Sequence, residues 1–330
     1  MYLGIDTHTR YAQVAVVDGD GNLHEEIRVP TDRLDDLAEQ YAGGEAAIEA
    51  SGHYRPAYEM LDEHLDVTLV NPSKNRVIAD ATVKTDRIDA KRLAHMLRTD
   101  MLAESYVPSD EIRTLRDLVR TRKSLVEERT AEKNRVRAVL KRTNNAYDSE
   151  LFGPTGREFL AELSLSDADR TIVEAHLSVI DEYDEQIDRL EEKIEQKTLE
   201  SPAAQRLLSI PGVGQSTAAL IVAEVGEIDR FDRHEELVSY AGLDPMVHQS
   251  GDTEVHGRIS KEGSAPLRWA LVQCAHVSVR YDEYLGNFYT RLKDRKNHQI
   301  AIVATARKLL VSIFYMLTRQ ETYDPPEVSA

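Results

Sequence analysis

A long run without glycine or proline, residues 109–142, constrains the fold of this chain more than any other stretch. Its apolar residues recur at roughly helical spacing, which predicts one long helix capped by Ser109. These apolar residues are Ile112, Leu115, Val119, Val126, Val136, Val139 and Leu140. A second long amphipathic helix is predicted from about 168 to 199. Two such helices joined by a loop predict a coiled-coil arm over residues 106–200, either antiparallel or intermolecular.

The two arm helices differ in charge. The first carries eleven Lys/Arg against six Asp/Glu, whereas the far end of the second is strongly acidic. The whole chain of 330 residues has a formal net charge of −17. Because a uniformly acidic surface would repel nucleic acid, the distribution of charge matters more than its sum. For the basic helix, nucleic-acid contact and a solvated charged face both remain open. For the acidic helix, a spacer or dimerisation role is favoured.

Residues 1–105 alternate strand and helix signals. Five strands are expected, at 2–6, 11–17, 23–29, 46–49 and 67–70. Asp18-Gly19-Asp20-Gly21 predicts a hairpin turn between the second and third. Helices are expected near 31–41 and 56–64, and again up to residue 98. Three consecutive strands followed by alternating helices and strands predict an α/β, ribonuclease-H-like (RuvC-like) domain.

Four carboxylates in this first domain stand where they can form one site. Asp6 and Glu49 end apolar strands, and Asp86 and Asp89 are three residues apart, so they share a helix face. Converging acids repel one another unless a cation neutralises them. Hard oxygen ligands suit Mg²⁺ or Mn²⁺, which could stabilise the attacking and leaving oxygens of a phosphodiester. For Asp86 and Asp89, the simpler interpretation is a solvated helix surface.

Cations gather near the second pair of acids. From Lys74 to Arg98 there are seven Lys/Arg against three Asp/Glu, and Lys84 and Arg87 flank Asp86 most closely. A metal-binding acid cluster ringed by cations is suited to a phosphate-backbone substrate. We therefore predict that Lys84 and Arg87 contact nucleic acid.

Residues 201–322 predict a third, mainly α-helical domain. Ile210-Pro211-Gly212-Val213-Gly214 between two helical segments is a helix-hairpin-helix pattern. Gly212 and Gly214 would let backbone N–H groups approach a phosphate at a helix N-terminus. A short hairpin is expected over 253–259 and a helix from Ser264. The tail, residues 323–330, is expected to be disordered.

Other reactive side chains give weaker signals. Ser250 precedes Gly251 in a polar loop, where serine is most often a turn residue, and no protease-type triad accompanies it. His8, His53 and His248 are interpreted as structural or solvated rather than as metal ligands. The single cysteine, Cys274, lies in an apolar stretch and is interpreted as a core residue. No signal peptide is recognised, and residues 300–317 are expected to form a buried helix, so a cytoplasmic protein without membrane contact is expected.

Several separated motifs, in order, resemble one known family. They are Gly4-Ile5-Asp6, Glu49-Ala50-Ser51-Gly52, Lys84-Thr85-Asp86-Arg87-Ile88-Asp89-Ala90, Ile210-Pro211-Gly212-Val213-Gly214, Tyr240-Ala241-Gly242-Leu243, Gln249-Ser250-Gly251, Ile259-Ser260-Lys261 and Leu267-Arg268. Over nearly its whole length, the chain resembles insertion-sequence transposases whose RuvC-like domain carries an Asp-Glu-Asp-Asp set. These are called bridge-RNA-guided recombinases, and site-specific invertases of the Piv type are their relatives.

The resemblance implies more than the residues do. It implies that Asp6, Glu49, Asp86 and Asp89 hold a divalent metal, and that Ser250 is the nucleophile. It also implies that DNA is cut and rejoined through a covalent phosphoserine, that a structured guide RNA pairs with target and donor, and that the protein is a homo-oligomer, dimeric or tetrameric. Lys261 and Arg268 are expected to hold the phosphate, with solvated cations as the simpler interpretation.

Three other functions stay open. A RuvC-like junction nuclease would use metal-activated water instead of serine. A sugar-kinase or actin-like ATPase is suggested by Gly4-Ile5-Asp6-Thr7, but no second glycine-rich phosphate hairpin is recognised. A non-catalytic nucleic-acid-binding protein would leave the four acids unexplained.

Overall fold

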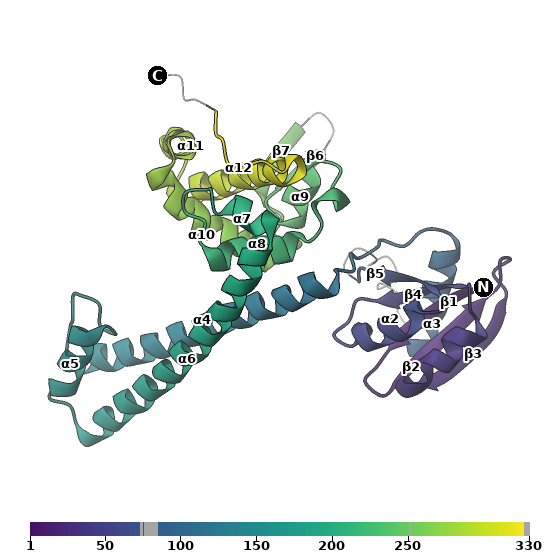
Figure 1. Cartoon of the computed structure of the whole chain (residues 1–330), viewed down its shortest axis with the longest axis horizontal. Coiled ribbons are helices and arrows are strands. Elements are labelled where there is room, and N and C mark those ends of the chain that lie inside the picture. The colour runs from purple at the N-terminus through teal and green to yellow at the C-terminus, as the bar shows by residue number, and fades with distance from the viewer. Residues whose placement is uncertain (73–74, 76–84, 251–252, 327–330) are drawn as a thin grey trace. The chain divides into compact units, whose positions relative to one another are not determined.

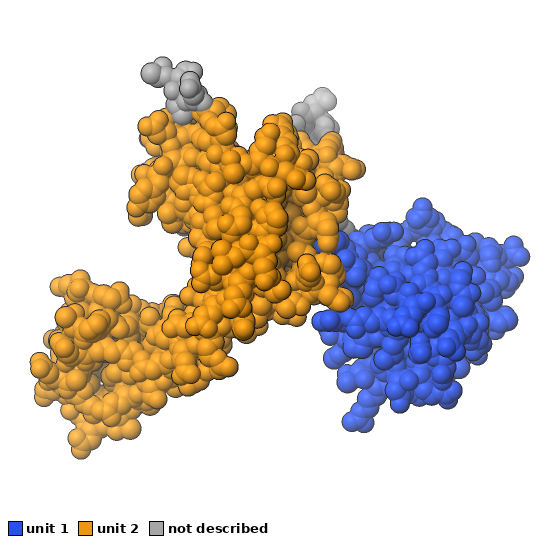
Figure 2. All heavy atoms as spheres, in the orientation of Figure 1, with its two compact units in different colours: residues 1–107 blue, residues 108–330 orange. Residues whose placement is uncertain are grey.

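The computed structural model describes residues 1–72, 75, 85–250 and 253–326, with the side chains of 247–257 also outside the description. The chain divides into two compact units, Met1–Val107 and Pro108–Ala330, which are coloured separately in Figure 2. The first is a mixed α/β unit and the second is mostly helical, which confirms the coarse prediction of fold class. The finer division at residues 105, 200 and 322 stays a prediction.

The first unit is built on a five-stranded sheet in the order β3-β2-β1-β4-β5. The strands are β1 (Tyr2–Thr7), β2 (Tyr11–Val17), β3 (Leu23–Pro30), β4 (Glu45–Glu49) and β5 (Asp66–Val70). The first three pair antiparallel, whereas β4 runs parallel to both β1 and β5. All five predicted strands are confirmed to within one or two residues.

Helices cover both faces of this sheet. They are α1 (Leu34–Gln40), which follows a 3₁₀ turn at Thr31–Arg33, α2 (Tyr54–Asp62) and α3 (Asp86–Arg98). Leu3 and Ile5 of β1 point to the face packed by α1 and α2, where they share a buried core with Leu34 and Leu61. The alternate residues of β1 point to the opposite face, which α3 covers through contacts with β1, β2 and β4. The site therefore lies on the α3 face.

The second unit begins with two long helices, α4 (Asp110–Arg142) and α6 (Asp167–Glu200), which pack side by side along their length in Figure 1. Arg142 at the end of α4 pairs with Asp169 at the start of α6, whereas Arg122, earlier in α4, pairs with Glu191, later in α6, so the two helices run antiparallel. Ser109 accepts a hydrogen bond from the Ile112 N–H, as predicted for the α4 cap. The short helix α5 (Pro154–Glu162) closes the far end of the arm.

The rest of this unit is a helical bundle with one hairpin. Its helices are α7 (Pro202–Leu207), α8 (Gln215–Val225), a 3₁₀ turn at Ile228–Arg230, α9 (His234–Tyr240), α10 (Ala265–Tyr281), α11 (Glu283–Lys293) and α12 (His298–Arg319). The hairpin consists of β6 (Pro245–Ser250) and β7 (Thr253–Ile259). The predicted hairpin over 253–259 is therefore wrong in extent, because that stretch is only the second strand and pairs with residues 245–250.

The helix α12 is long and apolar enough to cross a membrane by length and composition alone. Ten of its residues, from Ala301 to Leu317, are buried, and they pack against α7, α9, α10 and α11. This packing supports the interpretation of α12 as a core helix. Just beyond it, Tyr323 packs on the same core and its backbone N–H donates to the Ser209 hydroxyl, 2.8 Å away. The chain is thus ordered beyond the start of the predicted tail, whose last residues, 327–330, lie outside the description.

Candidate active site

The central strand β1 delivers Asp6 to the face of the sheet that α3 covers. Gly4 and Asp6 are two residues apart, so they share this face. A Cβ atom placed on Gly4 would lie 1.9 Å from the Ala90 carbonyl oxygen and 2.4 Å from the Ala94 backbone nitrogen. Only glycine permits this approach, and it lets α3 lie directly against the backbone of β1.

The first turn of α3 carries the second pair of acids. Thr85 caps the helix by accepting a hydrogen bond from the Ile88 N–H at 3.4 Å. Asp86 and Asp89 then occupy the first turn, where carboxylates are stabilised by the helix dipole. Because Gly4 brings this helix close to β1, the first turn of α3 lies near the end of the strand.

Asp6, Asp86 and His8 converge on one point. The Nε2 atom of His8 lies 3.2 Å from Oδ2 of Asp86 and 3.5 Å from Oδ2 of Asp6. One ligand atom from each of the three residues falls within 4.8 Å of the others, the spacing expected around a single metal ion. The Tyr11 hydroxyl donates to the same Asp86 oxygen at 3.1 Å.

The raised pKa of Asp6 indicates that Glu49 and Asp89 also lie near this point. The pKa of Asp6 is raised to about 6, mainly by burial and also by the charges of Asp86, Asp89 and Glu49, while His8 opposes the rise. Glu49, the last residue of β4, and Asp89 therefore lie near enough to act on Asp6. All four predicted carboxylates gather at one end of the sheet.

His8, which was interpreted from the sequence as structural or solvated, has its ring beside Asp6 and Asp86. It follows the end of β1 directly, and its backbone N–H donates to the Tyr11 carbonyl oxygen at 2.8 Å, which closes the turn into β2. The one available signal was its position two residues after Asp6.

Two nucleic-acid contacts, Arg87 and Lys84, were predicted near this site. Arg87 lies 3.2 Å from Glu26 of β3, and Lys91 contacts the same carboxylate. Arg87 is nonetheless 73% exposed, so it can still meet a ligand. Lys84 lies outside the described residues.

The predicted residues of the second unit lie around its hairpin and bundle. Ser250 is the last residue of β6 and pairs with Thr253 across the hairpin end. Lys261 has a left-handed backbone, with φ of 56°. Arg268 donates to the Ala241 carbonyl oxygen at 2.9 Å, and burial lowers its pKa. Both Lys261 and Arg268 thus lie beside the Ala241–Gly242 turn, since the Lys261 N–H donates to the Gly242 carbonyl oxygen.

The two glycines of the predicted phosphate loop have different surroundings. Gly212 has φ of 97°, and a Cβ there would lie 2.9 Å from the Ser278 backbone nitrogen of α10. Its conformation therefore serves the packing of the α7–α8 turn on α10. Gly214 is the N-cap residue of α8, and a Cβ there would meet open space. Of the two, Gly214 is the better placed to meet a ligand.

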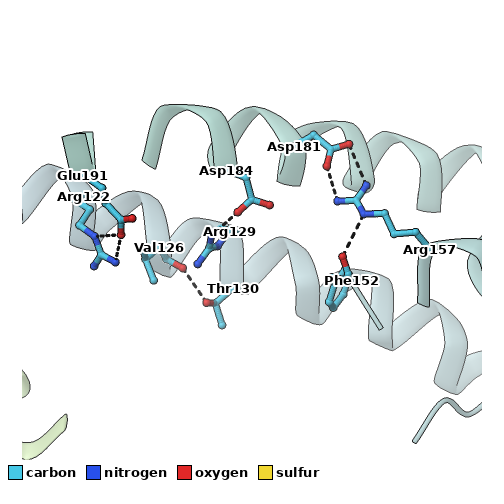
Figure 3. Close-up of polar contacts among 9 residues, drawn as sticks. All are labelled: Arg122, Val126, Arg129, Thr130, Phe152, Arg157, Asp181, Asp184 and Glu191. Carbon is cyan, nitrogen blue, oxygen red and sulfur yellow. Dashed lines mark hydrogen bonds and ion pairs between the residues drawn. The ribbon is translucent and has the colours of Figure 1, made fainter. Parts of the chain in front are cut away.

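Several basic side chains of α4 form ion pairs with acids of the same unit. Figure 3 shows Arg122 paired with Glu191 and Arg129 with Asp184, both acids belonging to α6. Arg142 pairs with Asp169 in the same way. Arg120 instead reaches Glu224 of α8, which is fully buried, through two bonds of 2.6 and 2.8 Å. These pairs favour a structural role for the basic helix.

Comparison with known proteins gives two family matches. Residues 3–145 match a family described as "Transposase", of the DEDD type of IS110, and residues 204–290 match the "Transposase IS116/IS110/IS902 family". The transposase for insertion sequence element IS1111A of Coxiella burnetii is 28% identical over 330 residues, covering 97% of this chain and 90% of the relative.

Two further relatives differ in coverage. A probable family 20 transposase of Pseudomonas aeruginosa is 26% identical over 345 residues, with 98% of each chain covered. The pilin gene-inverting protein of Moraxella bovis is 32% identical over 126 residues, covering 37% of this chain and 38% of its own length.

Proposed function

Because the chain belongs to the IS110/IS116 family of insertion-sequence transposases, we propose that it cuts and rejoins DNA through a serine nucleophile assisted by a carboxylate-bound divalent metal. The observation that carries the proposal is the convergence of Asp6 and Asp86 on one point, with Glu49 and Asp89 close enough to raise the pKa of Asp6.

The fold supports this proposal. A mixed sheet in the order β3-β2-β1-β4-β5, with three antiparallel strands and two further parallel ones, supports the interpretation of this unit as a ribonuclease-H-like (RuvC-like) domain. In that interpretation, Asp6 on the central strand and the acids at the end of β4 and on α3 form the metal-binding edge. The turn between α7 and α8 supports the helix-hairpin-helix interpretation of the second unit.

The residues at this edge fit a divalent cation. Asp6 and Asp86 offer hard oxygen ligands and His8 adds an imidazole nitrogen, a set compatible with Mg²⁺ or Mn²⁺. A bound ion would polarise the phosphodiester and offset charge on the attacking and leaving oxygens. Tyr11 holds one Asp86 oxygen by its hydrogen bond, so that it fixes the orientation of this carboxylate.

Ser250 supplies the nucleophile in this proposal. Its Oγ forms a bond to phosphorus while a DNA oxygen leaves, and the hydroxyl proton passes to solvent. Rejoining reverses the step, because the phosphoserine ester conserves the bond that water would hydrolyse. Lys261, Arg268, Arg87 and Lys84 would contact backbone phosphates, as would the N–H groups of Gly212 and Gly214.

The partners follow from the same proposal. The substrate is DNA at the element ends and at the target, and a structured guide RNA would select both by base pairing. The chain would act as a homo-oligomer, with α4 and α6 as a coiled-coil arm; the Arg122–Glu191 and Arg129–Asp184 pairs are seven residues apart on each helix, one heptad, which supports this interpretation of the arm.

The test is to trap the covalent intermediate. The full-length protein is incubated with labelled element-end DNA, guide RNA and Mg²⁺, then denatured and run on a gel. A labelled protein–DNA adduct is expected from the parent and from the Thr253→Ala control, which changes the residue that pairs with Ser250 in the β6–β7 register. No adduct is expected from Ser250→Ala or Asp6→Ala. Cleavage by the Ser250→Ala protein would instead support a junction nuclease that uses activated water.

A further inference from the structure

Six lysines and arginines lie close together on the helical hairpin α11–α12. From Tyr284 to Lys308 the chain has six Lys/Arg and one Asp/Glu, although the whole chain has a net charge of −17. The six are Arg291, Lys293, Arg295, Lys296, Arg307 and Lys308. The other basic helix, α4, is different because several of its arginines form ion pairs with acids of α6 and α8.

Three of these six cations, Arg291, Lys293 and Lys308, lie over aromatic rings. Within the part of the chain that the structure describes, none of the six forms an ion pair with a carboxylate. The Lys308 ammonium lies 4.1 Å from the ring centre of Tyr284 and 4.6 Å from that of Phe288. Arg291 lies 5.9 Å from the Phe288 ring. The charge of this surface is therefore not neutralised, and it is interleaved with flat apolar groups.

The rings of Tyr284 and Phe288 and the Lys308 side chain border a groove between α11 and α12, which pack against each other (Figure 1). Its volume is about 300 Å³, and it is lined by Tyr284 and Phe288 of α11 and by Arg307, Lys308 and Val311 of α12. Tyr284 and Phe288 are four residues apart and so share one face of α11. Arg307 is exposed, whereas the two rings and Lys308 are partly buried. The groove thus presents rings in its wall and cations along its rim.

We infer that the α11–α12 groove binds an unpaired strand of nucleic acid. Proteins that bind single strands combine a cationic groove along the backbone with aromatic rings on which bases stack. Arg291, Arg307 and Lys308 would contact successive phosphates, and the rings of Tyr284 and Phe288 would meet the bases. A duplex keeps its bases stacked on one another, so it could use the cations but not the rings. This inference rests on the proposed function in one respect, which is that the partner is a nucleic acid.

The test measures the binding of fluorescent 12-nucleotide probes to the full-length protein by fluorescence anisotropy, in a buffer that contains EDTA. The probes are dT₁₂, U₁₂ and a 12-base-pair DNA duplex. The groove variant is the triple substitution Arg291→Gln, Arg307→Gln and Lys308→Gln. The control removes the same charge from exposed cations of α6, by Arg189→Gln, Lys193→Gln and Lys197→Gln. Circular dichroism melting checks that both variants are folded.

The groove variant should bind the single strands at least about tenfold more weakly than the parent, and the control within about twofold. The dependence of log K on log salt should flatten by about 2, from three phosphate contacts at about 0.7 each. A Phe288→Leu protein, which keeps apolar bulk but loses the ring, should weaken single-strand binding by about fivefold or more and leave duplex binding unchanged. Tighter binding of U₁₂ than of dT₁₂ would identify the strand as RNA, and the reverse as DNA.

The inference fails if the groove and control variants lose affinity equally, or if Phe288→Leu weakens duplex and single strand alike. An acidic protein partner, the competing occupant, would also need the cations, but it would leave the binding of all three probes insensitive to the groove variant. Because the probe-binding measurements are made in EDTA, which removes divalent metal, they do not depend on a metal bound at the carboxylate site. Absence of the covalent adduct from the parent protein, or its persistence in Ser250→Ala, would overturn the proposed function without altering these binding results.

Discussion

Replacing Asp6 by Asn should stabilise the N-terminal unit while it abolishes DNA cleavage. Asp6 is held among three other carboxylates on a largely buried face, and its pKa is raised to about 6 from an ordinary value of 3.8. A raised pKa means that the folded state disfavours the ionised carboxylate, first through burial and then through its acidic neighbours. An amide of nearly the same shape removes the ionised form altogether.

The size of the effect follows from the two pKa values. Their difference, at about 1.36 kcal/mol for each pKa unit, corresponds to about 3 kcal/mol. Below pH 3.8 Asp6 is protonated in both the folded and the unfolded state, so it does not lower the free energy of unfolding. That free energy falls as the pH rises through about 6, where Asp6 ionises in the folded state. At pH 7.5 the Asn variant should therefore be more stable by up to about 3 kcal/mol, and near pH 3.5 the two proteins should be equally stable.

The measurement must report on the N-terminal unit alone. The only tryptophan, Trp269, lies in α10 of the other unit, so tryptophan fluorescence would miss the effect. Hydrogen exchange of β1 and β2 peptides, read by mass spectrometry in EDTA across this pH range, gives the local free energy of opening. Asp62→Asn, at an exposed position of α2, is the matched control and should leave exchange unchanged. Equal or lower protection in Asp6→Asn at pH 7.5 would refute the reasoning.

Three further outcomes follow from the packing and the site. Gly4→Ala should destabilise the N-terminal unit by about 1–3 kcal/mol, because its Cβ would strike the α3 backbone; Gly19→Ala, where a Cβ meets open space, should be neutral in the same exchange assay. Arg120→Ala should lower the free energy of unfolding of the second unit by about 3 kcal/mol, because it leaves the buried Glu224 carboxylate without its cation. Urea unfolding monitored by Trp269 fluorescence measures this loss. Adding Glu224→Leu should restore most of it, and no recovery in the double variant would contradict the reasoning. Added Mg²⁺ should slow hydrogen exchange of β1 in the parent protein through mass action, and equal slowing in Asp6→Asn would argue against a site at Asp6.

The sequence was sufficient where local patterns decide the structure. The five strands were predictable because their apolar residues form short runs bounded by turn residues. The long helix α4 was predictable because it has no breaker and begins at a good cap, Ser109. The gathering of Asp6 with Asp86 was also anticipated, since strand ends and a helical turn are natural places for converging side chains.

The rest depended on contacts between distant segments. The role of His8 beside Asp86 depends on how closely α3 approaches β1, which is decided by Gly4 and cannot be read from His8 itself. The first strand of the β6–β7 hairpin was missed because Pro245 and the polar residues after Val247 give no alternating pattern. The charge of α4 was ambiguous for the same reason, because its partners on α6 lie more than fifty residues away in the chain.

The spacing of the arm's charge pairs restricts how its length can vary among relatives. Arg122 and Arg129 of α4 meet Glu191 and Asp184 of α6, so the partners are seven residues apart on both helices. Because the helices are antiparallel, a residue gained in one of them moves every later pair out of alignment. Lengthening or shortening should therefore occur by whole heptads, and in both helices together. Natural variants that differ in arm length are expected to carry such matched insertions or deletions.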